Sequence, residues 1–89
     1  MAKYYSYSLI NELVGYLDGK DESKVDIPKN FLQKQIDEGE MTKELVKDII
    51  FQVNIRCYDR KLKFTEIENK IVISIIVVPE GFMWIEDLS

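Results

Sequence analysis

Residues 60–78 read RKLKFTEIENKIVISIIVV, and this stretch sets the fold class of the chain. Its second part, 71–78, consists almost entirely of β-branched residues, which favour strands, and 62–65 also carry strand-forming side chains. The polar cluster at 68–70 indicates a turn between the two. We therefore expect an antiparallel pair of strands here.

A third strand is predicted after this pair. Pro79, Glu80 and Gly81 suit a tight loop, because proline fits the second position of a turn and glycine tolerates a positive φ. Residues 82–86 would then return antiparallel. The expected sheet has two to four strands.

Apolar residues recur at helical spacing before the sheet. The first predicted helix covers about residues 7–18, with Ser6 or Ser8 as its N-cap. The second begins around Pro28, because proline is well tolerated in a first turn, and ends at Gly39, where a left-handed residue is usual.

A third helix is predicted from Thr42 onward, although the residues near its end fit two patterns. Apolar residues from 46 to 57 follow helical spacing, whereas residues 51–57 also alternate as a strand would. We favour the helix because no turn cluster separates this stretch from its N-cap. Cys57 would then lie on the buried side of the helix, and Arg56 and Arg60 near its C-terminal end.

These elements predict an α+β fold of about three N-terminal helices followed by a small antiparallel sheet, in a single domain covering residues 1–89. The 71–78 strand is apolar on both faces, and we expect three short helices to cover only one of them. We therefore expect a homodimer through the apolar sheet face, with a monomer as the alternative.

The composition excludes several kinds of chemistry. The 89 residues contain one cysteine and no histidine, so the chain has no internal disulfide, no cysteine-rich zinc site and not the usual general base. We expect Cys57 to be a small buried side chain rather than a nucleophile. The sequence predicts no enzyme activity, no metal and no cofactor.

The start MAKYYSYS has no apolar signal core, and a single cysteine is compatible with a reducing compartment. The longest apolar run, residues 71–78, is far shorter than the ~20 residues of a transmembrane helix. We expect a cytoplasmic protein with no membrane partner.

Residues 18–26 are rich in carboxylates and invite comparison with a calcium-binding loop. Lys20 and Ser23 occupy positions where an EF-hand loop requires an acid or amide and a glycine. We favour a solvated connection between helices that contributes no core residue.

Aromatic residues near both ends of the chain are candidates for a protein-binding surface, because such side chains provide large contact areas at interfaces. The alternative is that the tyrosines brace the sheet. The candidates are Tyr4, Tyr5, Tyr7, Phe82 and Trp84.

A local basic patch provides the second set of candidates. The net charge of the chain is −4, yet residues 56–63 carry +3. Arg56, Arg60 and Lys61 either cap the end of the third helix or bind a partner. In element order alone, three helices and a hairpin resemble a winged helix, whose third helix would enter the DNA major groove.

We therefore expect a small acidic protein-binding module that acts without catalysis. It would be a stoichiometric inhibitor, antitoxin, immunity or adaptor protein of phage or plasmid type, covering the functional surface of a host or viral protein. The alternative is a dimeric winged-helix-like DNA-binding regulator. Nucleic acid is the less expected partner because the chain is acidic, and a nuclease toxin is disfavoured for the same reason.

Overall fold

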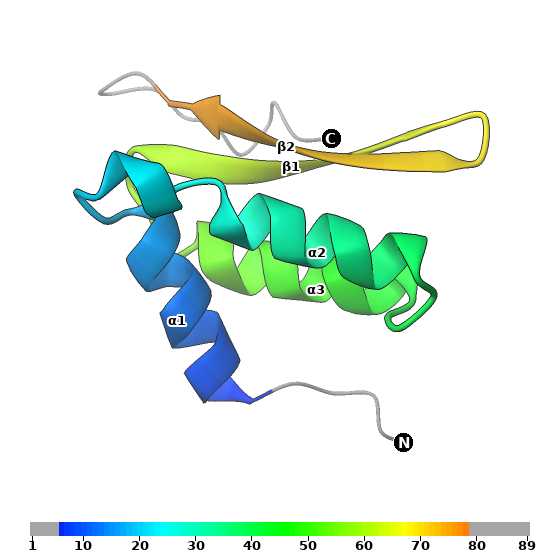
Figure 1. The fold of residues 1–89 in the computed structure, drawn as a ribbon, viewed down its shortest axis with the longest axis horizontal. Helices are drawn as coiled ribbons and strands as arrows, with labels where there is room; N and C mark the ends of the chain where they lie inside the picture. The colour runs from blue at the N-terminus through cyan, green and yellow to red at the C-terminus, as the bar shows by residue number, and fades with distance from the viewer. Residues whose placement is uncertain (1–5, 79–89) are drawn as a thin grey trace.

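The computed structural model describes residues 6–78, in which three α-helices precede one antiparallel β-hairpin (Figure 1). This order confirms the α+β fold class, and the sheet has two strands within these residues. The predicted strand at 82–86 lies outside the described residues. The elements are α1 Tyr7–Leu17, the 3-10 helix η1 Glu22–Lys24, α2 Ile27–Asp37, α3 Lys43–Asn54, β1 Arg60–Ile67 and β2 Lys70–Val77.

Local capping fixes the starts of α1 and α3 and the end of α2. The Ser6 hydroxyl accepts a hydrogen bond from Leu9 N at 3.2 Å, and the Thr42 hydroxyl accepts one from Leu45 N at 3.1 Å. Gly39, just after α2, has a φ of 73°, which glycine adopts without strain. These starts and this stop confirm the sequence-based predictions. None of the helices in residues 6–78 is long and apolar enough to cross a membrane.

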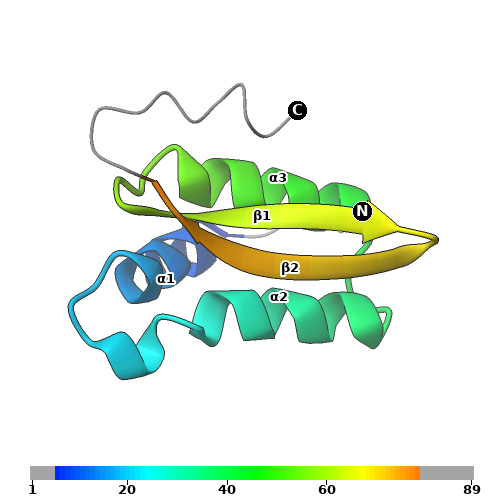
Figure 2. The same ribbon diagram turned by 90° about the horizontal axis from the view of Figure 1, so that it is seen from above.

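The helices lie in a layer under one face of the hairpin. α2 packs beneath β2 and α3 beneath β1, so the hairpin covers the space between the two helices when seen from above (Figure 2). α1 packs against both helices at the end where α2 begins and α3 ends (Figure 1).

The core is formed where these layers meet. Val25, only 8% exposed, is also part of it, which corrects the expectation that the 18–26 loop supplies no core residue. The turn of η1 places Val25 there, and Asp21 caps that turn by accepting a hydrogen bond from Ser23 N at 3.1 Å. The other buried aliphatic side chains are Ile10, Leu13 and Leu17 of α1, Leu32 of α2, Val46, Ile49, Ile50 and Val53 of α3, Leu62 of β1 and Ile73 of β2.

The end of α3 differs from the prediction. The helix stops at Asn54, and residues 55–59 form the connection to β1. The placement of Arg56, Cys57 and Arg60 within the helix is therefore wrong, and Arg60 instead begins β1. The burial of Cys57 is nevertheless confirmed, since its exposed fraction is 2%.

The turn predicted at 68–70 is confirmed and comprises two residues. Glu68 and Asn69 have φ values of 51° and 69°, and they join the paired residues Ile67 and Lys70. Positive φ at both central positions is typical of a type I′ turn, whose twist matches that of the flanking strands.

The two faces of the hairpin differ in their cover. Ile73 is buried against the helices, and Ile71 and Ile75 pack beside it. Val77 does not share this cover, because it is 73% exposed at the end of β2. Val72 lies on the opposite face and is 44% exposed. The helices of residues 6–78 thus cover one face only.

Side-chain amides hold both edges of the hairpin. On the β1 edge, Asn54 Nδ2 donates to Leu62 O at 2.9 Å while its Oδ1 accepts from Leu62 N at 2.8 Å. On the β2 edge, Gln33 Nε2 donates to Ile71 O at 2.9 Å and its Oε1 accepts from Ile73 N at 2.8 Å. Each helix under the sheet therefore supplies one amide that satisfies edge backbone groups, as a neighbouring strand would.

Candidate binding groove between α3 and β1

The structure brings together two of the predicted contact residues, Tyr7 and Arg56. The guanidinium carbon of Arg56 lies 6.0 Å from the centroid of the Tyr7 ring, and Tyr7 is 70% exposed. This distance is at the limit of a cation–π contact. The other aromatic candidates, Tyr4, Tyr5, Phe82 and Trp84, lie outside the described residues.

The three bases of the predicted patch all donate to backbone carbonyls at helix ends. Arg56 Nη1 donates to Gln52 O at 2.7 Å within the last turn of α3. Lys61 is only 4% exposed, and its Nζ donates to Asn54 O at 2.7 Å and also to Cys57 O. Cations are favourable at the C-terminal end of a helix, where carbonyl groups lack intrahelical partners.

Arg60 makes its hydrogen bonds at the end of α1 and not at the end of α3, where they were predicted. Its Nη1 donates to Leu17 O at 3.1 Å and to Gly19 O at 3.5 Å, at the end of α1. Its Nη2 pairs with Glu22 Oε2 at 2.8 Å. The basic cluster of the sequence is therefore divided between the ends of α1 and α3.

Exposed apolar side chains gather instead near the C-terminal end of α3. Phe51 is 57% exposed, Ile55 is 55% exposed and Tyr58 is 82% exposed. These three side chains are not among the contact residues predicted from the sequence. The available signal was helical spacing, because Phe51 and Ile55 stand four residues apart and fall off the buried stripe of the helix.

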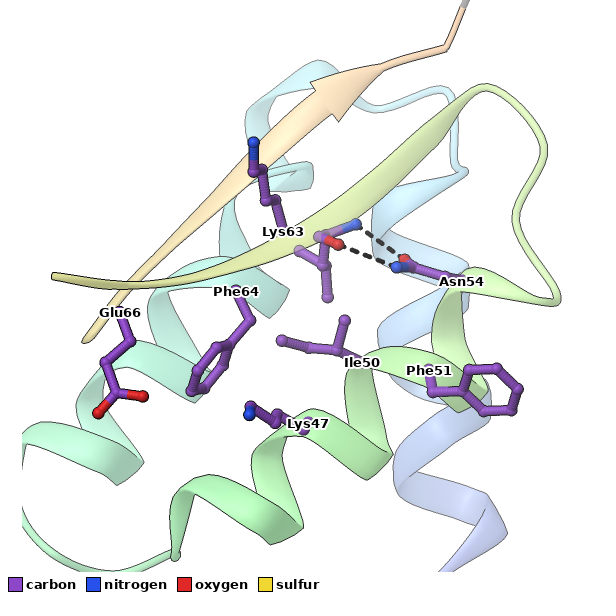
Figure 3. A pocket seen from close by; sticks show the side chains of 8 residues that line it. Lys47, Ile50, Phe51, Asn54, Lys63, Phe64 and Glu66 are labelled. Carbon is purple, nitrogen blue, oxygen red and sulfur yellow. Dashed lines mark hydrogen bonds between the residues drawn. The ribbon is translucent and has the colours of Figure 1, made fainter. Parts of the chain in front are cut away.

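A groove of about 460 Å³ lies beside Phe51, between α3 and the edge of β1 (Figure 3). Ile50 and Phe64 point into it from the two elements, and the Asn54–Leu62 hydrogen bonds close one end. Lys63 extends to the opposite face of β1 from Phe64. The lining residues are Lys47, Ile50, Phe51, Asn54, Leu62, Lys63, Phe64 and Glu66.

Two lysines of α3 set the charge at the other end of the groove. Lys47 Nζ lies 5.1 Å from the centroid of the Phe64 ring, within reach of a cation–π contact. Lys43 Nζ pairs with Glu66 Oε2 at 3.0 Å. The hydrogen bond from Lys43 to Glu66 and the attraction between their charges raise the pKa of Lys43.

The β1 backbone in the groove offers hydrogen-bonding groups. The two-residue turn makes Ile67 and Lys70 a hydrogen-bonded pair, so the pairs Glu66–Ile71 and Phe64–Ile73 are of the non-hydrogen-bonded kind. The N–H and C=O of Phe64 and Glu66 therefore point away from β2, as those of Leu62 do toward Asn54. Within residues 6–78 no hydrogen bond reaches these groups of Phe64 and Glu66.

The nearby thiol is not poised for reaction. Burial raises the pKa of Cys57 to about 11, with a smaller contribution in the same direction from the charge of Asp18. At neutral pH the side chain is a buried thiol, as its packing requires. Among the described residues, no three His, Cys, Asp or Glu side chains lie close enough to hold a metal ion.

The groove has features of a binding surface. It combines exposed aromatic surface, cationic side chains and backbone groups that lack partners within residues 6–78, the components of peptide recognition. Comparison of the chain with protein-family models, with curated proteins and with solved structures finds no match.

Proposed function

We propose that this chain is a protein-binding module that acts without catalysis and contacts its partner through the groove between α3 and β1. The observation that carries this proposal is that Phe51, 57% exposed, lines that groove, and that the exposed side chains of Ile55 and Tyr58 follow it in the chain. Clustered aromatic and aliphatic side chains at a concave surface are typical of the centre of an interface.

The kind of module is inferred from the sequence together with this surface. The protein is small and acidic, with a net charge of −4 and no histidine. A stoichiometric inhibitor, antitoxin, immunity or adaptor protein of phage or plasmid type needs only a contact surface that covers the functional surface of a host or viral protein. The proposal requires no cofactor and places the protein in the cytoplasm.

A dimeric winged-helix-like DNA-binding regulator stays the second candidate, because the order of three helices and a hairpin is present. The charges on the surface of α3 favour DNA binding less than protein binding. Lys43 is paired with Glu66, and Lys47 has the acidic Asp48 next to it in the sequence and Glu44 nearby, so a phosphate backbone would meet mixed charge. Charge reversal at Lys43 and Lys47 that leaves DNA binding unchanged would remove this candidate.

The deciding experiment is a tagged pull-down from host or infected cells, with and without nuclease, followed by titration of the purified partner. We expect one protein at a one-to-one ratio, unaffected by nuclease. A Phe51→Ser variant should weaken binding at least about tenfold, because it removes an interface aromatic. An Ile67→Ser variant is the matched control, because Ile67 is 61% exposed on the outer face of β1.

Two outcomes would overturn the proposal. Recovery of DNA fragments that share a sequence would make this chain a regulator. Equal binding by the wild type and the Phe51→Ser variant, with loss in the Ile67→Ser variant, would move the contact surface to the outer face of the sheet.

A further inference from the structure

We propose that the groove takes an extended, acidic segment of the partner, which adds to the edge of β1 as an antiparallel third strand at Phe64 and Glu66. This inference rests on the proposed protein-binding function and specifies the conformation and chemistry of the partner at the same site. It follows from the backbone of β1, from the spacing of side chains on α3 and from their charge.

The backbone of β1 selects a strand as the occupant. The N–H and C=O of Phe64 and Glu66 point into the groove and have no hydrogen-bond partner within residues 6–78. Two such residues, separated by one, present the hydrogen-bonding pattern that an added antiparallel strand requires. The Asn54 amide already makes hydrogen bonds to the N–H and C=O of Leu62, so strand addition would begin at Phe64.

The edge of β2 is a poorer template for the same interaction. The Gln33 amide makes hydrogen bonds to Ile71 O and Ile73 N. These atoms belong to two successive residues whose backbone groups point away from β1. A strand added there would have to displace the Gln33 side chain. The β1 edge is therefore the one on which the partner strand is expected.

The side chains of α3 specify which residues the added strand carries. The partner residues opposite Phe64 and Glu66 would both project toward α3, because side chains two apart in a strand share a face. α3 runs antiparallel to β1, since Lys43 contacts Glu66 whereas Asn54 contacts Leu62. The residue opposite Glu66 would therefore meet Lys43 and Lys47, and the one opposite Phe64 would meet Ile50 and Phe51.

Charge and direction then define a short pattern. A carboxylate suits the position beside Lys43 and Lys47, because the two lysines would neutralise it together with Glu66. A large apolar side chain suits the position beside Ile50 and Phe51. In an antiparallel strand the position opposite Glu66 comes first, so the pattern is an acidic residue followed, two residues later, by a large apolar one.

Synthetic peptides test this pattern directly. The first probe is a seven-residue threonine peptide with aspartate at its third position and leucine at its fifth. The second exchanges these two residues, and the third has lysine instead of aspartate. We expect the first peptide to bind at least about tenfold more tightly than either of the others, and to protect the Phe64 and Glu66 amides from hydrogen exchange.

Protein variants separate strand addition from contact by side chains alone. Glu66→Pro and Glu66→Ala both remove the ion pair with Lys43, but only proline removes the outward-facing N–H, which an edge strand tolerates. We expect Glu66→Pro to abolish binding of the first peptide and Glu66→Ala to retain it. Lys47→Glu should weaken that peptide at least about tenfold, whereas Lys34→Glu, at an exposed position of α2, should not.

Circular dichroism of each variant verifies the fold before binding is compared. Equal binding of the three peptides, binding unaffected by Glu66→Pro, or no binding at millimolar concentration would overturn the proposed strand addition. The proposed function would survive these results if the partner still depended on Phe51 in the pull-down titration. Loss of that dependence would instead overturn the proposed function.

Discussion

Asn54 is polar and has an exposed fraction of zero, and its amide bonds both backbone groups of Leu62. At this single residue α3 ends, the edge of β1 is satisfied and one end of the groove is closed. A buried amide is stabilising only while its partners are present, because each unsatisfied group costs free energy.

Replacement of Asn54 by leucine should therefore be strongly destabilising. Leu62 N and O would remain buried without partners, and we expect the free energy of unfolding to fall by about 3 kcal/mol. Urea denaturation would measure it. Gln33→Leu is the matched comparison, because Gln33 makes an equivalent pair of bonds at a half-buried site where water can replace it, with an expected loss of about 1 kcal/mol. Equal losses would contradict this account.

Cys57 should make stability depend on alkaline pH. Burial raises its pKa to about 11 in the folded state, whereas an unfolded cysteine titrates near about 8.5. The contribution of the protonated thiol to the free energy of unfolding is complete below the pKa of the unfolded cysteine. It is lost as the pH rises toward the pKa of the folded state, because only the unfolded chain releases the proton between these two values. We expect the stability difference between wild type and Cys57→Ala to shrink by about 2 kcal/mol between pH 8 and pH 10.5. A constant difference would show that the thiol is not protected.

At the scale of elements, the helices and the hairpin are joined by polar contacts that connect distant parts of the chain. Arg60 at the start of β1 binds the end of α1, and Gln33 of α2 binds β2. The beginnings of α1 and α3 were predictable because their caps lie within three residues of the groups they bind. The end of α3 was not, because Asn54 and Leu62 are eight residues apart and meet only after folding.

Substitutions of Arg60 and Glu22 test whether the contact between the start of β1 and the end of α1 stabilises the fold. Arg60→Met removes the bonds to Leu17 O and Gly19 O, and we expect a loss of about 1–2 kcal/mol in the free energy of unfolding. Glu22→Gln should change it by no more than about 0.5 kcal/mol, because the Glu22 side chain is 77% exposed and surface ion pairs contribute little. Thermal denaturation compares the two. A larger effect of Glu22→Gln would mean that the ion pair dominates.

At the scale of the whole molecule, the predicted homodimer would form through the outer face of the hairpin. Register places Ile67, Val72, Lys63 and Lys70 on this face, so apolar and basic side chains are mixed. A homodimer through the apolar sheet face stays a prediction. Apposed copies of a face that carries Lys63 and Lys70 would bring like charges together, which weakens association at low salt.

Sedimentation equilibrium tests this surface. We expect a weak dimer that tightens with added salt, because salt screens repulsion between lysines while apolar burial is retained. Val72→Lys should abolish it. Val77→Lys is the control, because Val77 is exposed at the end of β2 on the opposite side of the strand from Val72. A monomer at every salt concentration would leave the groove beside α3 as the contact surface to pursue.

The sequence by itself determined the fold class, the starts of α1 and α3, the stop at Gly39 and the turn at residues 68–70. These features depend on residues close together in the chain, through caps, turn residues and periodic burial. Tertiary structure alone decided that Arg60 binds the end of α1 and that Phe51 flanks a groove at the edge of β1. The physical reason is that accessibility and hydrogen-bond partners arise from packing between segments far apart in sequence, which local patterns do not encode.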